Sequence, residues 1–352
     1  MLTKEEFIER LSENRDFKHT HLAVQELEKE VEWTQEERKQ LLDIAAQCGQ
    51  VYGTLAYEGN SRVRDFYREI LKNYTGVQDE NVDRVIRKVL TIDNEEIYEF
   101  LDENKQEILK REKIAKVWED EEHGIKVSSC DGLYHANSVS TSISFIKNKM
   151  LYSRQYGEEQ FQTNQTGQAS DDSDKSDGIY NDLFFDNCDI RAFSNKHSAY
   201  GPISFVMDEK ILLDPDISVR ITKENPGNAG AINPFGEKPY TERYFTSIEE
   251  LKEHMWEDNP NSEKYKLLFR TRGNHHTTFW NKSTLELTPE NLKYILLERN
   301  SDENRILQVK KRLEEELAAV GLQDVPVILR KTLPSMEIKF AAPLEVLWEL
   351  PE

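Results

Sequence analysis

The chain has 352 residues, with 66 acidic and 46 basic side chains, and its formal net charge at pH 7 is −20. This charge opposes non-specific binding of the whole chain to nucleic acid or to an anionic membrane. The chain has 3 widely spaced cysteines and no CxxC motif, which excludes a disulfide framework and a cysteine-rich zinc site. We find neither an apolar run of about 18 residues nor an N-terminal signal segment, so we expect a cytoplasmic protein that does not engage a membrane.

Proline divides the chain into two regions. All 11 prolines lie within 202–352, and residues 1–201 have none. Because proline interrupts helices, its absence is typical of a helical region. Apolar residues recur at helical spacing in this region, as at Ile97, Phe100 and Leu101. We therefore predict an all-α N-terminal domain over 1–118.

The pattern changes after Trp118. Four consecutive acidic residues at 119–122 precede His-Gly, which is typical of a linker, and we place that linker at 119–131. Short apolar runs and helical stripes then alternate, which predicts a mixed α+β domain over 132–352. The polar residues 155–178 are predicted to form a loop.

Within this second domain a strand ends near His135 and a short helix covers the residues that follow. Further strands are predicted at 125–127, 203–207, 211–213, 265–271, 277–280, 325–329, 337–340 and 344–350. Residues 288–320 are predicted to form two helices, the second running from about Asn300 to Gly321.

Several common catalytic motifs are absent. The chain contains no G-x-G-x-x-G, no G-x-x-x-x-G-K-[ST], no H-E-x-x-H and no G-x-S-x-G. Their absence argues against dinucleotide-binding Rossmann, P-loop, zincin and α/β-hydrolase chemistry. Histidines and carboxylates do not recur at metal-ligand spacing, and no metal site is predicted.

One segment carries a more specific pattern. Leu-Tyr-His-Ala-Asn-Ser at 133–138 is followed by an amphipathic stretch and then by Leu-Tyr-Ser-Arg at 151–154. This order resembles the NAD-binding opening of DarT-like ADP-ribosyltransferases, whose pattern is Tyr-His-x-Thr/Ser, a helix and then Gly-Leu-Leu-Ser. Lys149 or Met150 occupies the position of the glycine.

Two later segments extend the resemblance. Tyr-Gly-Pro-Ile-Ser-Phe-Val at 200–206 resembles the family's strand with a Tyr-Val-Pro-aromatic pattern. Residues 336–347 resemble its final segment, in which a glutamate begins an apolar strand, and this register places Glu337 at the catalytic position. The matched residues number a few dozen between 133 and 350, and the predicted helical domain is not covered.

The resemblance implies an ADP-ribosyltransferase-like fold and NAD as the substrate. Cleavage of the nicotinamide–ribose bond passes through an oxocarbenium-like centre, which a fixed carboxylate stabilises. Glu337 is the catalytic candidate, and Glu345 is its rival if the register differs. The candidate NAD-binding residues are His135, Asn137, Ser153, Arg154 and Tyr200. Arg154 would bind the pyrophosphate, and His135 would donate a hydrogen bond to a ribose hydroxyl or orient the amide.

Each candidate also has a simpler interpretation. His135 can be a hydrogen-bonded strand-end histidine, Arg154 a surface arginine and Glu337 a charge that protects a sheet edge. The net charge of −20 disfavours DNA as the acceptor. The sequence does not distinguish another nucleic acid from a protein as the macromolecular acceptor. By analogy the family points to a toxin or phage-defence system, with residues 1–118 binding a protein partner. The alternative function is a non-enzymatic acidic inhibitor or adaptor that binds a basic partner.

Overall fold

The structure is a computed structural model that describes most of the chain from residue 92 onward. The described residues are 92–109, 117–161, 174–175, 179–187, 189–192, 197–198, 200–217, 219–222, 245, 247–255, 276–279, 282–331, 334 and 343–351. The helices predicted within 1–91 lie outside these residues. So do the strands predicted at 265–271 and 337–340.

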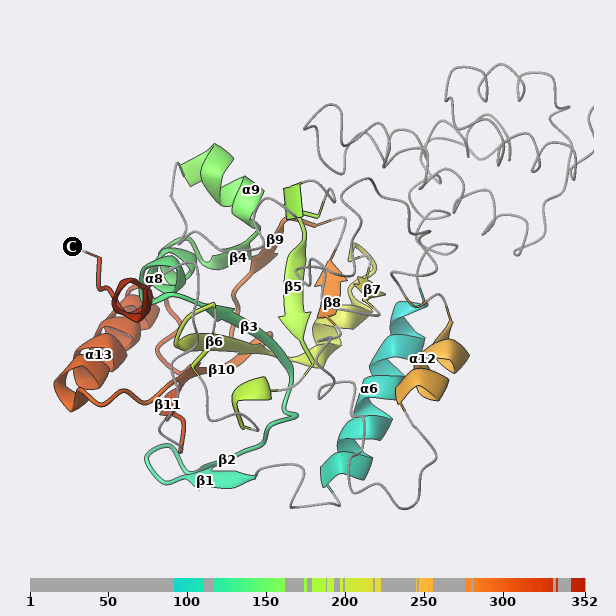
Figure 1. The fold of residues 1–352 in the computed structure, drawn as a ribbon, viewed down its shortest axis with the longest axis horizontal. Coiled ribbons are helices and arrows are strands. Elements are labelled where there is room, and N and C mark those ends of the chain that lie inside the picture. Colours follow the sequence, from blue (N-terminus) through green and yellow to red (C-terminus); the bar gives the residue numbers. More distant parts are fainter. Residues whose placement is uncertain are drawn as a thin grey trace, which may run out of the picture.

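A mixed sheet organises the described part of the chain (Figure 1). Its seven strands lie in the order β11-β10-β6-β3-β5-β8-β7. The bounds are β3 Leu133–Asn137, β5 Leu183–Asp186, β6 Ile203–Met207, β7 Val219–Ile221, β8 His276–Phe279, β10 Leu292–Leu297 and β11 Val327–Leu329. Strands β10 and β11 run parallel, and the other neighbours run antiparallel. The described region is therefore mixed α+β, as predicted.

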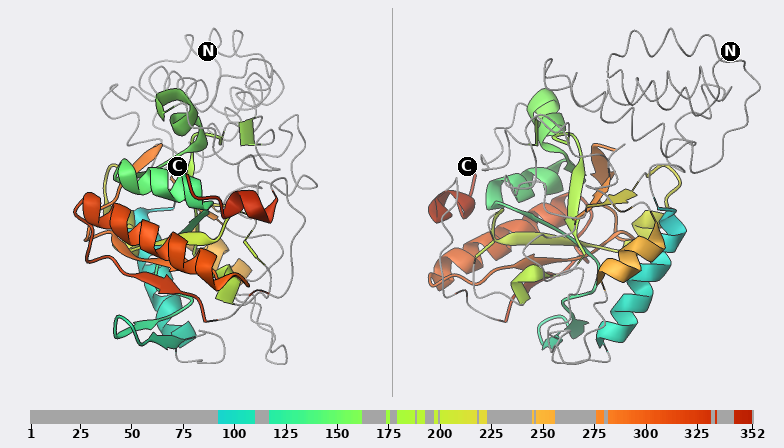
Figure 2. Two further views of the ribbon diagram at one scale, coloured as in Figure 1. Left: turned by 90° about the vertical axis from the view of Figure 1, so that its left-hand side faces the viewer. Right: turned by 45° about the vertical axis from the view of Figure 1, so that its right-hand side comes forward.

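Two helices cover one face of the sheet. Helix α8 (Val139–Lys147) follows β3 and packs beside α13 (Glu303–Ala319), and the two lie side by side in Figure 2. Ser138 caps α8 and Asp302 caps α13, each accepting hydrogen bonds from backbone N–H groups of the first turn. The large core beneath them includes Ile143, Phe145 and Leu313.

The opposite face carries a smaller core. Successive residues of a strand point to opposite faces, so Leu133 joins the large core and Tyr134 the smaller one. The hairpin of β1 (Trp118–Asp120) and β2 (Ile125–Val127) packs here through Trp118 and Ile125. The segment predicted as an acidic linker is therefore a hairpin, and its turn is held by an ion pair between Glu122 and the buried Lys310 of α13.

Helix α6 (Asn94–Leu109) confirms the helical pattern predicted around Ile97. It packs against the 3-10 helix η3 (Glu209–Leu213) and α12 (Ile248–Met255), with α12 alongside it in Figure 1. Ile97 and Phe100 are buried in the same large core as the sheet. A helix N-terminal to the predicted boundary at 118 thus shares the core of the C-terminal sheet.

Short elements complete the described region. Strands β4 (Met150–Tyr152) and β9 (Thr284–Glu286) pair separately. Helix α9 (Arg154–Tyr156) continues into a π-helical turn over Gly157–Phe161, so the start of the predicted 155–178 loop is helical. A 3-10 turn spans Ile190–Ala192 and helix α14 spans Leu344–Leu347.

Three sequence predictions were wrong in element type. Residues 292–297, predicted as helix, form β10, which is buried between two neighbouring strands and therefore lacks the alternation that marks a half-exposed strand. Residues 211–213, predicted as a strand, belong to η3, whose first turn is capped by Asp208. The predicted strand over 344–350 begins as helix α14 directly after Pro343.

Candidate functional site

The carboxyl end of β3 brings together most of the candidate residues. His135 and Asn137 lie on β3, and Asn137 pairs in register with Ile203 at the start of β6. The loop before β6 carries Tyr200, and the connection from β4 to α9 carries Ser153 and Arg154. Glu337 lies outside the described residues, and Glu345 is an exposed residue of α14.

His135 has a defined tautomer. Its ring lies between Phe145 and Phe185, with ring centroids 5.6 and 5.5 Å away. Its Nδ1 lies 2.7 Å from the backbone carbonyl oxygen of Phe184. Because a carbonyl only accepts hydrogen bonds, Nδ1 carries the proton and Nε2 of the neutral ring is an acceptor.

The charge state of His135 follows from its surroundings. Burial lowers the pKa of His135 to about 4, and the positive charge of Arg154 adds to this, while the hydrogen bond to Phe184 opposes it. The imidazole is therefore neutral at pH 7. The sequence interpretation allowed His135 to donate to a ribose hydroxyl, but this tautomer makes Nε2 a hydrogen-bond acceptor for such a hydroxyl. The effect of Arg154 on His135 also indicates that the two side chains are near each other.

Ser153 has a structural role. Its hydroxyl caps α9 by accepting from the Tyr156 N–H at 3.1 Å, and it donates to the Asn181 side-chain oxygen at 2.7 Å. Its own N–H donates to the Ser283 carbonyl at 2.7 Å. The side chain is buried, so Ser153 acts by fixing the start of α9 and thereby the position of Arg154.

The glycine position of the sequence pattern has a matching backbone conformation. Lys149 has φ of 52°, in the left-handed region that favours glycine. It follows the last turn of α8 and donates its N–H to the Ile146 carbonyl at 2.9 Å, which ends the helix. Of the two residues that sequence reasoning left open for that position, Lys149 has this geometry.

The loop that carries Tyr200 approaches β3 closely. Gly201 has φ of 136°, and a Cβ atom there would lie 2.2 Å from the backbone carbonyl of Asn137. The Tyr200 N–H donates to the Ser198 hydroxyl at 3.2 Å. Glycine is therefore required between Tyr200 and Pro202, and the close approach places Tyr200 beside the end of β3. Asn137 is itself 8% exposed.

Buried ionic groups near this end of the sheet were missed by sequence reasoning. Glu298, after β10, contacts His197 and Ser198, and Arg330, after β11, pairs with Asp189 and donates to the Ser204 hydroxyl at 3.1 Å. The paired groups lie 101 and 141 residues apart in the chain. No local pattern links such positions. The only available signal was an acidic or basic residue directly after an apolar run.

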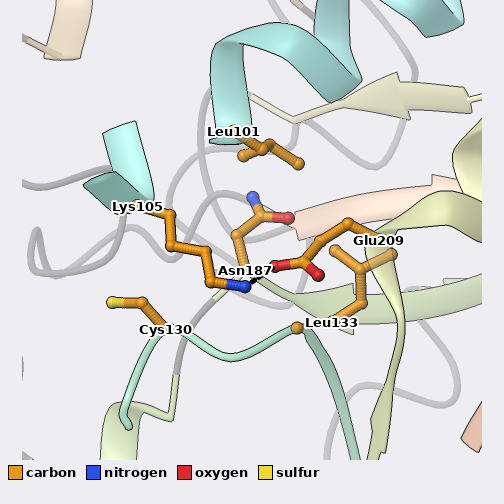
Figure 3. A pocket seen from close by; sticks show the side chains of 7 residues that line it. Leu101, Lys105, Cys130, Leu133, Asn187 and Glu209 are labelled. Carbon is orange, nitrogen blue, oxygen red and sulfur yellow. Dashed lines mark hydrogen bonds and ion pairs between the residues drawn. The ribbon is translucent and has the colours of Figure 1, made fainter. Parts of the chain in front are cut away.

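A small cavity lies at the other end of β3, beside α6 and η3 (Figure 3). Its volume is about 10 Å³, which is room for roughly one water molecule and far too little for a nucleotide. Lys105 points towards Glu209, with Nζ 3.4 Å from Oε1. Burial raises the pKa of the Cys130 thiol to about 11, so Cys130 is not a nucleophile at neutral pH.

The described residues contain no cluster of three or more His, Cys, Asp or Glu side chains that could hold a metal ion. No helix in this part of the chain is long and apolar enough to cross a membrane. We compared the chain with protein-family models, curated proteins and solved structures, and none of them matches.

Proposed function

We propose that the chain is an ADP-ribosyltransferase-like enzyme that binds NAD at the carboxyl end of β3. It cleaves the nicotinamide–ribose bond and transfers ADP-ribose to a macromolecular acceptor. His135 and Asn137 lie on β3, and Tyr200 precedes Gly201, whose backbone approaches Asn137 closely. Arg154 begins α9, and its charge influences His135. Ser153 caps α9 and thereby fixes the position of Arg154.

The observation that carries the proposal is the fixed tautomer of a neutral His135 at the carboxyl end of β3, with the positive charge of Arg154 in its surroundings. Arginine matches the two phosphates of NAD, and a fixed imidazole acceptor suits a ribose hydroxyl. The left-handed backbone at Lys149 adds support, because it falls where the related pattern has glycine. In this proposal Glu337 stabilises the positive charge that develops on the ribose carbon.

The chemical step is tested by nicotinamide release. Glu337→Gln keeps the shape of the side chain but removes its charge, and we expect turnover to fall by about 10²–10³ with NAD affinity kept. Glu345→Gln is the matched control, because Glu345 is exposed on α14 and should be dispensable. If Glu345→Gln loses turnover and Glu337→Gln does not, the register is wrong. If wild-type protein releases no nicotinamide with nucleic-acid, protein or water acceptors, the proposal fails.

A second candidate function is binding of a basic partner without catalysis. It is favoured by the solvent-facing side of α6, where acidic side chains are exposed at Glu95, Glu96, Glu99, Asp102 and Glu103. In either case we propose that residues 1–118 contact a protein partner. For the enzyme, we propose a toxin or phage-defence context from the family resemblance alone. Pull-down with wild-type protein and with a variant carrying Gln at these five positions tests this candidate: loss of a basic partner would favour it.

A further inference from the structure

His197 and Glu298 form a buried pair that is joined through one ring nitrogen of the histidine. His197 Nδ1 lies 3.0 Å from Glu298 Oε2, and Glu298 Oε1 accepts the Ser198 N–H at 2.9 Å. His197 is 8% exposed and Glu298 2%. Because the carboxylate accepts hydrogen bonds, Nδ1 of neutral His197 carries the proton and Nε2 holds the lone pair. Among the described residues, nothing binds Nε2.

The pair lies along the same end of the sheet as the candidate NAD site. Asn137 is in register with Ile203, and Ile203 with Leu297, the residue before Glu298. The Glu298 N–H also donates to the Pro202 carbonyl at 2.8 Å. Since neighbouring strands are about 4.8 Å apart, Glu298 begins roughly 10 Å from the end of β3. A bound dinucleotide together with its acceptor spans more than this distance.

The arrangement is that of a general base. A carboxylate that holds Nδ1–H fixes the ring and stabilises the imidazolium that forms when Nε2 takes a proton. If Glu298 only anchored the loop before β6, its hydrogen bond from the Ser198 N–H would already serve that purpose without a histidine. The pair was not among the residues that the sequence indicated.

We infer that His197 is the general base that activates the acceptor, with Glu298 as its positioning residue. This inference rests on the proposed function. The bond from the ribose carbon to nicotinamide breaks, and its electron pair leaves with nicotinamide, which departs neutral. An acceptor O–H or N–H group bonds to the ribose carbon through its lone pair, and its proton moves to His197 Nε2. Solvent then removes that proton. The acceptor class is thus a weakly acidic hydroxyl or amide N–H.

The test uses the full chain with adenine-labelled NAD and single-stranded DNA, total RNA, cell protein or water as acceptor. For each acceptor that wild-type protein modifies, His197→Gly should lower the rate of ADP-ribose transfer by about 10²–10⁴-fold and leave NAD affinity unchanged. Free imidazole should restore part of the loss, because it fills the vacated position as a base. Glu298→Gln should also lose transfer, since its amide would donate to Nδ1 and move the ring proton to Nε2.

His123→Gly is the matched control. His123 also pairs with a carboxylate, Asp120, at 2.5 Å, but it lies on the exposed turn of the β1–β2 hairpin. It should show neither loss nor rescue. A transfer rate of His197→Gly within a few-fold of wild type would overturn the inference. A lower rate that imidazole does not restore would also overturn it, provided that the variant unfolds at the same temperature as wild type. In both cases wild-type protein is active, so the proposed function stands. A wild-type protein that releases no nicotinamide overturns both.

Discussion

The two ends of β3 use polar side chains in different ways. At the amino end, the Tyr134 hydroxyl donates to the Ser128 carbonyl at 2.9 Å and accepts from the Asp131 N–H at 3.0 Å, and the Asp131 carboxylate accepts from Tyr294 at 2.7 Å. At the carboxyl end, His135 and His197 each use Nδ1 and leave Nε2 without a partner among the described residues. The network of Tyr134, Asp131 and Tyr294 stabilises the fold, whereas a positioned ring nitrogen that makes no contact with the described residues is available for a ligand.

The largest effect on stability should come from the buried ion pair between Arg330 and Asp189. Asp189 follows β5 in the chain and forms a buried ion pair with Arg330, which follows β11. Arg330→Ala leaves the Asp189 carboxylate buried without its partner, and we expect the free energy of unfolding to fall by about 3–5 kcal/mol. Chemical denaturation measures this. A loss below about 1 kcal/mol would contradict this stabilising role of the ion pair.

Acid should destabilise the folded protein through His135, which lies at the carboxyl end of β3. The pKa of His135 is about 4 in the folded chain and near 6.5 when unfolded, so the unfolded chain binds the proton first. Its stabilising contribution is therefore complete above pH 6.5 and is lost as the pH falls towards 4, by about 3 kcal/mol. The difference between wild type and His135→Gln, followed by denaturation from pH 7 to 4, isolates this dependence. Parallel curves for the two proteins would contradict the lowered pKa of the partly buried His135.

A smaller loss is expected at the amino end. Tyr294→Phe removes one hydrogen bond to Asp131 and should lower the free energy of unfolding by about 1–2 kcal/mol. NAD affinity should not change, because this network lies away from the proposed site. A variant with normal stability but weakened NAD binding would reverse the assignment of the two ends.

The smallest effect concerns the turn before β4. Lys149→Gly should raise the free energy of unfolding by up to about 1 kcal/mol, since glycine adopts the left-handed conformation without a steric cost. Lys147→Gly, within the last turn of α8, should instead lower it by about 1 kcal/mol. Thermal unfolding of the two variants should therefore shift in opposite directions.

Local patterns predicted part of this architecture. The helix over 303–319 and the strand over 203–207 have long or uniformly apolar patterns and were predicted correctly. β10 was predicted as helix, because a short and mostly apolar segment does not show whether it is a buried strand or a buried helix. The sequence pattern pointed to His135 and Arg154, but it did not identify the partners of Glu298 and Arg330, which are distant in the chain. Only the strand register brings such groups together.

The measurement that tests the central claim most directly is the shift in unfolding temperature on adding NAD. At 100 times its dissociation constant, NAD should stabilise wild-type protein by about 2.7 kcal/mol. Arg154→Ala, at the carboxyl end of β3, should lose most of this stabilisation. Lys105→Ala, beside the cavity at the amino end, should keep it. No shift in wild-type protein, or an equal shift in wild type and Arg154→Ala, would contradict an NAD site at the carboxyl end of β3.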